Sequence, residues 1–470
     1  MKLLLTRIAE FLAATGKCPP DAIAQGYSID SRTLQPGELF FAVKGDRLDG
    51  HDFVEQALSR GACAAVIRRD QLTRYPNPMG LLAVGNTLLA LQTLATAVRK
   101  LWGKTAIGIT GSMGKTTTKE AVAHLLSTKY RVHRTKGNFN NHFGLPLGLL
   151  TLEPEYDLAV VEMGMSHAGE IAALARIAVP NQGVVTNVAP VHLEYFDSIA
   201  GIARAKYELV EALPGSGTAF LNADDEYVSQ FGRDFKGRAV LYGLKTFADV
   251  RAENIEVLGA EGMRFDLLCG GTTCDGLRQR VHSPLLGQHN VYNVLAAAAV
   301  ALDHGITPSE IAEALPTLSA ADKRGQVVQV GNITVLYDCY NSSPRALMAA
   351  VDTLAAMPAR RRIVVAGEML ELGSTGEQLH RDCGQYMAAK KIDFLLGVRG
   401  LAKAMVDAAS AAGLKSAFVA TPEEAGEWLV RETRDGDVVL LKASRGVRLE
   451  KALETWRQKI GLPSAPPDGH

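Results

Sequence analysis

Residues 110–118 read Thr-Gly-Ser-Met-Gly-Lys-Thr-Thr-Thr, a pattern typical of loops that bind phosphate. An apolar run at 106–110 precedes this segment and a helical pattern at 115–127 follows it, which is the context that such a loop requires. The strict pattern has a glycine where this chain has Ile109, so the segment is a variant of the loop. The alternative is a glycine-rich turn without a ligand, and the strand and helix around the segment favour the phosphate loop.

Each part of the loop has a chemical use. Gly111 and Gly114 allow backbone amides to turn toward an anion, and the start of a helix adds a favourable dipole. Lys115 supplies positive charge for the β- and γ-phosphates, and the hydroxyl of Thr116 suits a magnesium ion. The sequence therefore predicts a nucleoside triphosphate site formed by Gly111, Ser112, Met113, Gly114, Lys115, Thr116 and Thr117.

Three more residues are expected at the same edge of the sheet. Glu162 ends the apolar strand at 157–164, His192 follows the strand at 183–188, and Lys206 lies in a helical stretch farther along. Taken alone, each has a plainer explanation: a solvated edge residue, a packing histidine, or a solvated helical lysine. Their expected convergence beside the phosphate loop favours a catalytic role, with Glu162 suited to hold a magnesium ion.

Length and composition restrict the class of protein. The chain has 470 residues, and its 50 Lys+Arg balance its 50 Asp+Glu. Zero net charge argues against a nucleic-acid partner, which usually requires a basic excess. No run approaches about 18 uncharged apolar residues, so no membrane span is expected. The six cysteines include no zinc-ligand set, which indicates reduced thiols and a cytoplasmic location.

Alternation of strands and helices predicts an α/β protein of three domains. A chain of this length gives about three domains at about 150 residues each. Residues 1–84 indicate a small α/β domain. Residues 85–314 indicate a doubly wound, mostly parallel sheet that carries the phosphate loop. Residues 315–470 alternate again and indicate a Rossmann-like domain.

With these residues in view, the chain resembles the Mur ligases, the ATP-dependent amide-bond-forming enzymes of peptidoglycan precursor synthesis. The resemblance covers almost the whole chain. The segments that carry it are 30–53, 110–117, 160–164, 190–196, 205–209, 287–297, 338–344, 368–373 and 442–453.

Within the family, the segments 135–150 and 338–344 favour the branch that adds the dipeptide D-alanyl-D-alanine to UDP-N-acetylmuramoyl-tripeptide. The Asp-Asn-Pro-Arg run usual in the diaminopimelate-adding branch is absent from the sequence. The chain departs from the family pattern at Ser342-Ser343, at Ala443 and at His142. None of these removes a residue that the chemistry requires, and the third residue of the accepted tripeptide, diaminopimelate or lysine, stays open.

The resemblance implies a reaction through an acyl phosphate, with ATP and two Mg²⁺ ions as cofactors. It implies that Thr116 and Glu162 hold one ion. It assigns the other ion to Glu162, His192 and a carbamate formed from Lys206 and CO₂. A carbamate provides oxygen ligands for a hard cation, whereas an ammonium group would repel it.

The resemblance also assigns residues to each substrate. The UDP substrate is expected at residues 1–84, and residues 315–470 are expected to close on ATP and the dipeptide. For Asn290, a cap at the start of the following helix is the alternative, and the other residues could be loop hydrogen-bonders. The expected residues are Asn290, Arg324 and Asp338 for ATP; Ser31, Arg32, Asn138 and Asn141 for the UDP substrate; and Tyr340, Asn341, Ser444 and Arg445 for the dipeptide side.

Two rival functions remain open at this point. A folylpolyglutamate-type ligase shares the phosphate loop and the lysine, but it normally lacks a separate UDP-binding unit such as the one indicated by residues 30–53. A phosphate-loop NTPase that is no ligase would not need Glu162, His192 and Lys206 together. The expected protein is a monomeric cytoplasmic ligase for cell-wall biogenesis, and hence for cell shape and division.

Overall fold

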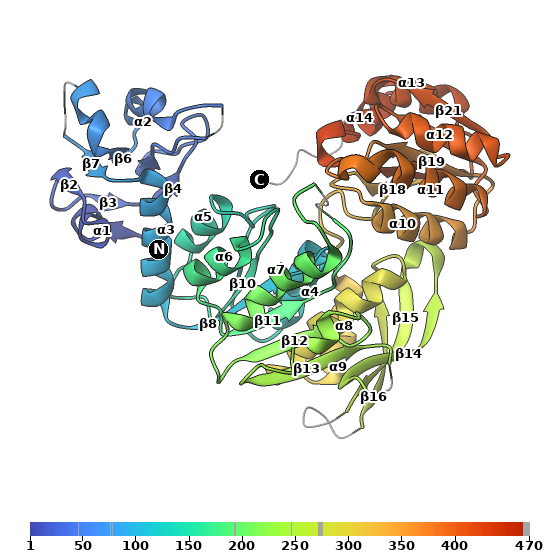
Figure 1. Cartoon of the computed structure of the whole chain (residues 1–470), viewed down its shortest axis with the longest axis horizontal. Coiled ribbons are helices and arrows are strands. Elements are labelled where there is room, and N and C mark those ends of the chain that lie inside the picture. The colour runs from blue at the N-terminus through green and yellow to red at the C-terminus, as the bar shows by residue number, and fades with distance from the viewer. Residues whose placement is uncertain are drawn as a thin grey trace.

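The computed structural model describes residues 1–45, 47–75, 77, 79–191, 194–245, 247–270 and 276–463. Within these ranges three large sheets follow one another along the chain, and Figure 1 shows them as three separate lobes from blue to red. The sequence prediction of an α/β fold with a mostly parallel central sheet and a Rossmann-like C-terminal unit is confirmed. The domain limits at residues 84 and 314 stay predictions.

The N-terminal lobe is built on a five-stranded sheet of order β2-β7-β6-β5-β4. Its three central strands are almost fully buried, as expected for parallel strands covered on both faces. The elements are β1 (Leu3–Leu4), α1 (Leu5–Leu12), β2 (Thr15–Lys17), β3 (Ile23–Ala24), β4 (Gly26–Ser28), β5 (Glu38–Phe41), α2 (Val54–Ser59), β6 (Ala64–Arg68) and β7 (Leu81–Val84).

The central lobe has a nine-stranded sheet of order β16-β15-β14-β13-β12-β11-β8-β10-β9. Neighbouring strands from β9 to β14 run parallel, while β15 and β16 add an antiparallel edge that the sequence analysis did not predict. The strands are β8 (Thr105–Thr110), β9 (Val132–Arg134), β10 (Leu158–Glu162), β11 (Gln182–Val185), β12 (Thr218–Asn222), β13 (Arg238–Gly243), β14 (Val250–Val257), β15 (Met263–Cys269) and β16 (Arg278–Ser283).

Helices cover both faces of this sheet. One apolar core joins it to α4 (Lys115–Leu126), α8 (Gln288–Asp303) and α9 (Pro308–Ala314). A second core joins it to α5 (Gly144–Leu150), α6 (Glu170–Ala178) and α7 (Ile199–Glu211). The second core continues into the N-terminal sheet, so these two lobes share apolar packing.

The C-terminal lobe has a six-stranded sheet of order β17-β18-β22-β19-β20-β21, parallel except at the β17 edge. Helices α10, α11 and α12 pack on one face, and α13 and α14 on the other. The elements are β17 (Gln326–Val330), β18 (Ile333–Asp338), α10 (Pro344–Ala356), β19 (Arg362–Gly367), α11 (Gly376–Ala388), β20 (Phe394–Val398), α12 (Ala402–Ala411), β21 (Ser416–Val419), α13 (Pro422–Glu432), β22 (Val438–Lys442) and α14 (Glu450–Lys459).

Helix α3 (Thr87–Trp102) leads from the N-terminal sheet into the central one. Its first turn is capped by Asn86, whose side chain accepts a hydrogen bond from the Leu89 amide. Near its other end the buried Arg99 guanidinium donates to the carbonyl oxygens of Ala178 (2.8 Å) and Val179 (3.0 Å). These are carbonyls at the end of α6, so Arg99 fastens the connecting helix to the central lobe.

A membrane span is absent from the part of the chain that the structure describes, since none of its helices combines the necessary length and apolar character.

The Arg99 contact gives a stability prediction. Arg99→Met keeps a long apolar stem but removes the donor to the buried Ala178 carbonyl oxygen, so the free energy of unfolding should fall by about 1–3 kcal/mol. Chemical denaturation followed by circular dichroism measures the change. Lys100→Met, at the exposed neighbouring position, is the matched control and should change stability by less than about 0.5 kcal/mol. An equal loss in both variants would contradict the role given to Arg99.

Candidate functional site

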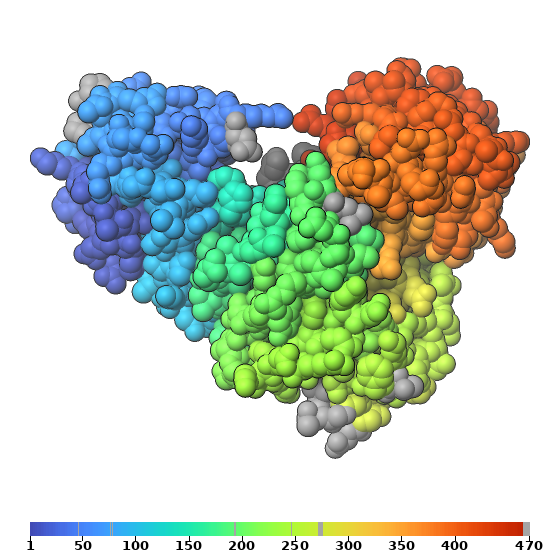
Figure 2. Space-filling view, in the orientation of Figure 1, coloured from blue at the N-terminus to red at the C-terminus, as the bar shows by residue number. Residues whose placement is uncertain are grey.

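A cavity of about 620 Å³ lies where the central and C-terminal lobes meet. Figure 2 shows these two lobes in contact, while the surface is hollowed between the N-terminal and C-terminal lobes. The phosphate loop and α10 both line the cavity, so its walls come from segments far apart in the sequence. Among the residues expected at the site, it brings together Ser112, Met113, Gly114, Lys115, Thr116, Thr117, Asn141, Glu162, Asn290, Arg324, Asp338, Tyr340, Asn341, Ser444 and Arg445.

The phosphate loop has the predicted surroundings: β8 ends at Thr110, and α4 begins at Lys115. Two glycines are required by space as well as by conformation. At Gly111 (φ 145°) a Cβ atom would lie 1.9 Å from the Thr186 Oγ1 atom, and at Gly114 (φ 80°) one would lie 2.3 Å from the Asn293 Oδ1 atom. The loop therefore packs backbone directly against its neighbours and keeps the start of α4 open toward the cavity.

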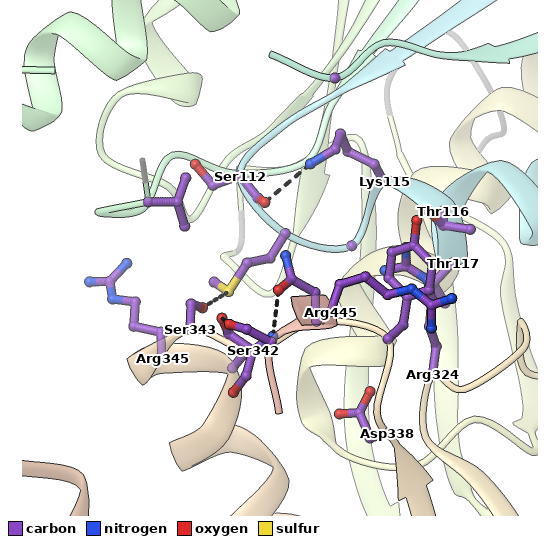
Figure 3. A pocket seen from close by; sticks show the side chains of 18 of the residues that line it. Ser112, Lys115, Thr116, Thr117, Arg324, Asp338, Ser342, Ser343, Arg345 and Arg445 are labelled. Atoms are coloured by element: carbon purple, nitrogen blue, oxygen red, sulfur yellow. Dashed lines mark hydrogen bonds between the residues drawn. The ribbon is translucent and has the colours of Figure 1, made fainter. Parts of the chain in front are cut away.

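Lys115 folds back over its own loop. Its Nζ donates to the carbonyl oxygens of Gly111 (2.8 Å) and Ser112 (3.2 Å), and Figure 3 shows the second of these contacts. Burial lowers the pKa of Lys115, an effect that nearby Glu162 opposes. The ammonium group is thus held beside the loop amides, where the charge of a bound phosphate would be concentrated.

Glu162 is a buried carboxylate with two side-chain donors. Thr116 Oγ1 donates to Glu162 Oε2 (2.7 Å), and Asn140 Nδ2 donates to Glu162 Oε1 (2.8 Å). Burial alone would raise the pKa of Glu162, but Arg324 and Lys115 outweigh it and hold the pKa below its usual range. The Thr116 hydroxyl and an ionised Glu162 together offer the oxygen ligands that Mg²⁺ prefers beside a nucleotide.

The sequence analysis missed Asn140. The segment 135–150 was singled out, but Asn138 and Asn141 were chosen from it. In the structure Asn138 is exposed and does not line the cavity, while the Asn141 Oδ1 atom accepts hydrogen bonds from the amides of Phe143 and Gly144. The asparagines within residues 138–141 were the feature of the sequence that could have indicated Asn140. Only the fold shows which of them reaches Glu162.

Lys206 lies on α7 and is 1 % exposed. Burial, and then the charge of Lys115, lower the pKa of Lys206 well below its ordinary value. Its ammonium group has no hydrogen-bond or ion-pair partner in the described part of the chain. His192, expected beside it, lies outside the described residues. No cluster of three or more His, Cys, Asp or Glu side chains suited to a metal is found in the described ranges.

The C-terminal lobe contributes positive charge and aromatic surface. The Arg324 guanidinium lies over the Tyr340 ring, 3.9 Å from its centre, and the Arg445 guanidinium lies 5.9 Å from the same centre. Lys442, which the sequence analysis missed, donates from Nζ to Asp338 Oδ2 (2.5 Å). Asp338 therefore faces the cavity with one oxygen already paired.

The sequence left two roles open for Asn290, a contact with ATP or a cap of the following helix, and the structure excludes the cap. Helix α8 begins at Gln288 with Gly287 at its cap position, so Asn290 is not the cap. Asn290 Nδ2 donates to the Leu286 carbonyl oxygen (2.7 Å), and Asn290 Oδ1 accepts from Asn293 Nδ2 (2.7 Å). The side chain lines the cavity from inside the first turn of the helix.

Ser31 and Arg32, expected at the UDP substrate, lie in the N-terminal lobe away from this cavity. The buried Ser31 hydroxyl donates to Gln56 Oε1 (2.8 Å). Arg32 is exposed and pairs with Asp30 Oδ2 (2.7 Å), and that pairing lowers the pKa of Asp30. Arg32 remains open to solvent, while Ser31 already has a partner.

The lobes and the phosphate loop define a nucleotide-binding ligase of the Mur type, and family models agree along the chain. Residues 24–98 match the catalytic domain of the Mur ligase family, residues 109–301 the Mur ligase middle domain, and residues 323–445 the glutamate ligase domain of Mur ligases. The chain belongs to the Mur ligase family.

Two curated relatives with the same name match almost the whole chain. The UDP-N-acetylmuramoyl-tripeptide–D-alanyl-D-alanine ligase of Bacillus subtilis is 35 % identical over 97 % of this chain and 98 % of its own length. The ligase of the same name from Escherichia coli is 36 % identical over 93 % of this chain and 95 % of its own length.

Solved structures agree in fold. A MurF structure from Acinetobacter baumannii superposes with a TM-score of 0.88 at 28 % identity, covering 97 % of this chain and 99 % of that one. MurF from Thermotoga maritima, solved in complex with ADP, gives a TM-score of 0.81 at 27 % identity, covering 93 % of this chain and 98 % of that one.

The Asn140 contact gives a second prediction. Asn140→Ala frees one oxygen of Glu162 to rotate, so a magnesium–nucleotide complex should bind about 10- to 100-fold more weakly. Isothermal calorimetry with ADP, with Mg²⁺ and then with EDTA, measures the change. The loss should be confined to the measurement with Mg²⁺. An equal loss in EDTA would show that Asn140 acts on the nucleotide or the fold instead.

Proposed function

We propose that this chain is an ATP-dependent ligase that joins D-alanyl-D-alanine to the tripeptide carboxylate of UDP-N-acetylmuramoyl-tripeptide. The observation that carries the proposal is the cavity in which the phosphate loop of one lobe faces the 338–344 segment of another. Further support comes from the sequence identity that this chain shares with curated ligases of that name over nearly their full length. The product is a precursor of peptidoglycan, so cell shape and division depend on it.

The chemistry requires two anions to meet. An oxygen of the tripeptide carboxylate attacks the γ-phosphorus of ATP, the bond from that phosphorus to the β,γ-bridging oxygen breaks, and ADP leaves. The dipeptide amine then attacks the acyl carbon, loses a proton, and inorganic phosphate departs. Positive charge must offset the phosphate and carboxylate charges before they can react. Lys115 and Arg324, both at the cavity, supply that charge from opposite lobes.

Magnesium fits the oxygen ligands found here. Thr116 and Glu162 would hold one ion, and Mg²⁺ typically takes one or two protein ligands together with phosphate oxygens. Glu162, His192 and a carbamate on Lys206 would hold a second ion. When bound, the ions neutralise charge on the phosphates and orient them.

The environment of Lys206 suits formation of a carbamate. A pKa well below the ordinary value leaves more of the amine neutral, and only the neutral amine attacks the carbon of CO₂. The nitrogen then loses a proton and becomes part of a carbamate anion. Carbamate formation would remove a buried cation that has no partner among the described residues. The same reaction would supply an oxygen ligand for the second ion.

The three lobes would divide the work. Residues 1–84 would hold the UDP end of the substrate with Ser31 and Arg32, and Asn138 and Asn141 would face the muramoyl-peptide. Residues 85–314 would bind ATP, with Asn290 near the base. Residues 315–470 would close over the site: Arg324 and Asp338 on the nucleotide, and Tyr340, Asn341, Ser444 and Arg445 on the dipeptide side. We further propose a monomer that works in the cytoplasm.

The test is an amine screen. Purified protein receives ATP, Mg²⁺, UDP-N-acetylmuramoyl-tripeptide and one candidate amine at a time, and phosphate release is measured. Release should require both the tripeptide and D-alanyl-D-alanine. Release with a single amino acid in place of the dipeptide, or with a folate substrate, would assign the chain to another ligase class.

A third prediction concerns Lys206. Lys206→Ala should lower kcat by at least about 100-fold, because it removes a ligand of the second ion. A small carboxylic acid such as acetate should restore part of the activity by entering the vacated space. Arg204→Ala, on the exposed face of the same helix, is the control and should keep its activity. Full activity of Lys206→Ala without added acid would rule out the carbamate role.

A fourth prediction concerns closure. Substrates held between lobes should draw the lobes together and exclude water from an acyl phosphate that would otherwise hydrolyse. Small-angle scattering should therefore show a smaller radius of gyration with a non-hydrolysable ATP analogue and the tripeptide substrate than with neither. An unchanged radius at saturating ligand would contradict closure.

A further inference from the structure

The segment that follows β11 holds the backbone of the phosphate loop. Strand β11 ends at Val185, which pairs with Thr110 at the end of β8. Beyond the strands, the Ser112 amide donates to the Asn187 carbonyl oxygen (2.9 Å). The Asn187 side chain then takes both polar groups of the Met113 backbone: its Oδ1 accepts from the Met113 amide (2.9 Å), and its Nδ2 donates to the Met113 carbonyl oxygen (3.2 Å). One carboxamide thus continues the pairing of the two strands into the loop.

These contacts divide the amides of the loop into two groups. The Ser112 and Met113 amides already have acceptors on Asn187. The Lys115 and Thr116 amides open α4, and neither makes a hydrogen bond within the described ranges. The first amides of a helix are the donors that bind an anion. Asn187 therefore sets the point in the loop from which the amides are open to phosphate.

Asn187 is itself held in place by its neighbours. The next residue, Val188, is buried, and its amide donates to Asp225 Oδ2 (2.8 Å). The carbonyl oxygen of the preceding residue, Thr186, accepts from Asn222 Nδ2 (2.9 Å). The Asn187 side chain is half-buried and lines the cavity from this anchored segment. A side chain whose own backbone is fixed on both sides can fix the loop that it contacts.

We propose that Asn187 braces the phosphate loop as a positioning residue, an inference that rests on the proposed function. By holding both polar groups of the Met113 backbone, Asn187 keeps the loop in the shape that receives the β-phosphate. Without the carboxamide the Met113 peptide would be free to turn, and phosphate contacts that depend on fixed geometry would weaken. The same segment leads along the chain to His192, so this brace would also keep the loop in register with a proposed ligand of the second ion.

The test compares two nucleotides that differ by one phosphate. In Asn187→Ala, ADP should bind about 10-fold more weakly, the size expected for the loss of two neutral hydrogen bonds. AMP lacks the β-phosphate that the loop receives, so its binding should be unchanged. Competition calorimetry on the purified chain measures both affinities without any ligase activity. During turnover, KM for ATP should rise by a similar factor, while KM for UDP-N-acetylmuramoyl-tripeptide stays unchanged.

A second measurement separates a brace from a direct contact with phosphate. In the nucleotide-free protein, hydrogen–deuterium exchange of the Ser112 and Met113 amides should be faster in Asn187→Ala than in the native chain. Asn222→Ala is the matched control, because it removes a hydrogen bond to the same segment but none to the loop. This control should keep native exchange at Ser112 and Met113 and native affinity for ADP.

Each outcome decides the role of Asn187. Unchanged ADP affinity in Asn187→Ala, or an equal loss for ADP and AMP, would overturn the inference. Weaker ADP binding with native exchange in the loop would assign Asn187 to direct contact with phosphate and would also overturn the brace. If circular dichroism shows Asn187→Ala to be unfolded, Asn187→Leu, which keeps the side-chain volume, replaces it in the same measurements. Absence of turnover by the native enzyme would refute the proposed function, while ADP binding and hydrogen exchange would still decide this inference.

Discussion

A buried carboxylate that stays ionised is the constraint on which the site depends. Glu162 lies at the end of a fully buried strand, where burial alone would favour its protonated form. It remains charged because cations surround it: Lys115 and Lys119 from the phosphate-loop helix, and Arg324 from the start of the C-terminal lobe. The ionised form of this proposed metal ligand is therefore sustained by charges from two lobes, so the contact between those lobes would also affect the proposed chemistry.

The segments around Glu162 are tied to one another by hydrogen bonds. Lys119 is fully buried and its Nζ donates to the Thr135 carbonyl oxygen (2.7 Å), which ties the helix that follows the phosphate loop to the segment that carries Asn140. Asn140 in turn reaches Glu162. One continuous set of contacts thus links the phosphate loop, the proposed metal ligand Glu162 and the segment expected to face the muramoyl-peptide. A change at any of these positions alters the surroundings of the same carboxylate.

Patterns in the sequence were sufficient to predict those parts of the molecule that are formed by residues adjacent in the chain. The phosphate loop could be predicted because its strand, glycines and helix are adjacent in the chain. The antiparallel edge could not, because β14, β15 and β16 carry alternating charged residues and lack the apolar runs of the buried strands. The pairing of Asp338 with Lys442 was equally hidden, since it requires the parallel register of β18 on β22. The contact of Asn140 with Glu162 could not be predicted from the sequence for the same reason, since it joins segments that only the fold brings together.

The distribution of charge follows from the same physics. Equal numbers of acidic and basic residues give the whole chain no net charge, yet several of its cations face one cavity. Lys115 comes from one lobe, and Arg324, Arg345 and Arg445 come from the other, so positive charge is densest only when the lobes meet. Substrate anions between the lobes would offset the mutual repulsion of these cations. Anionic substrates and lobe contact would therefore favour each other, so that the proposed binding and closure would be two aspects of one electrostatic balance.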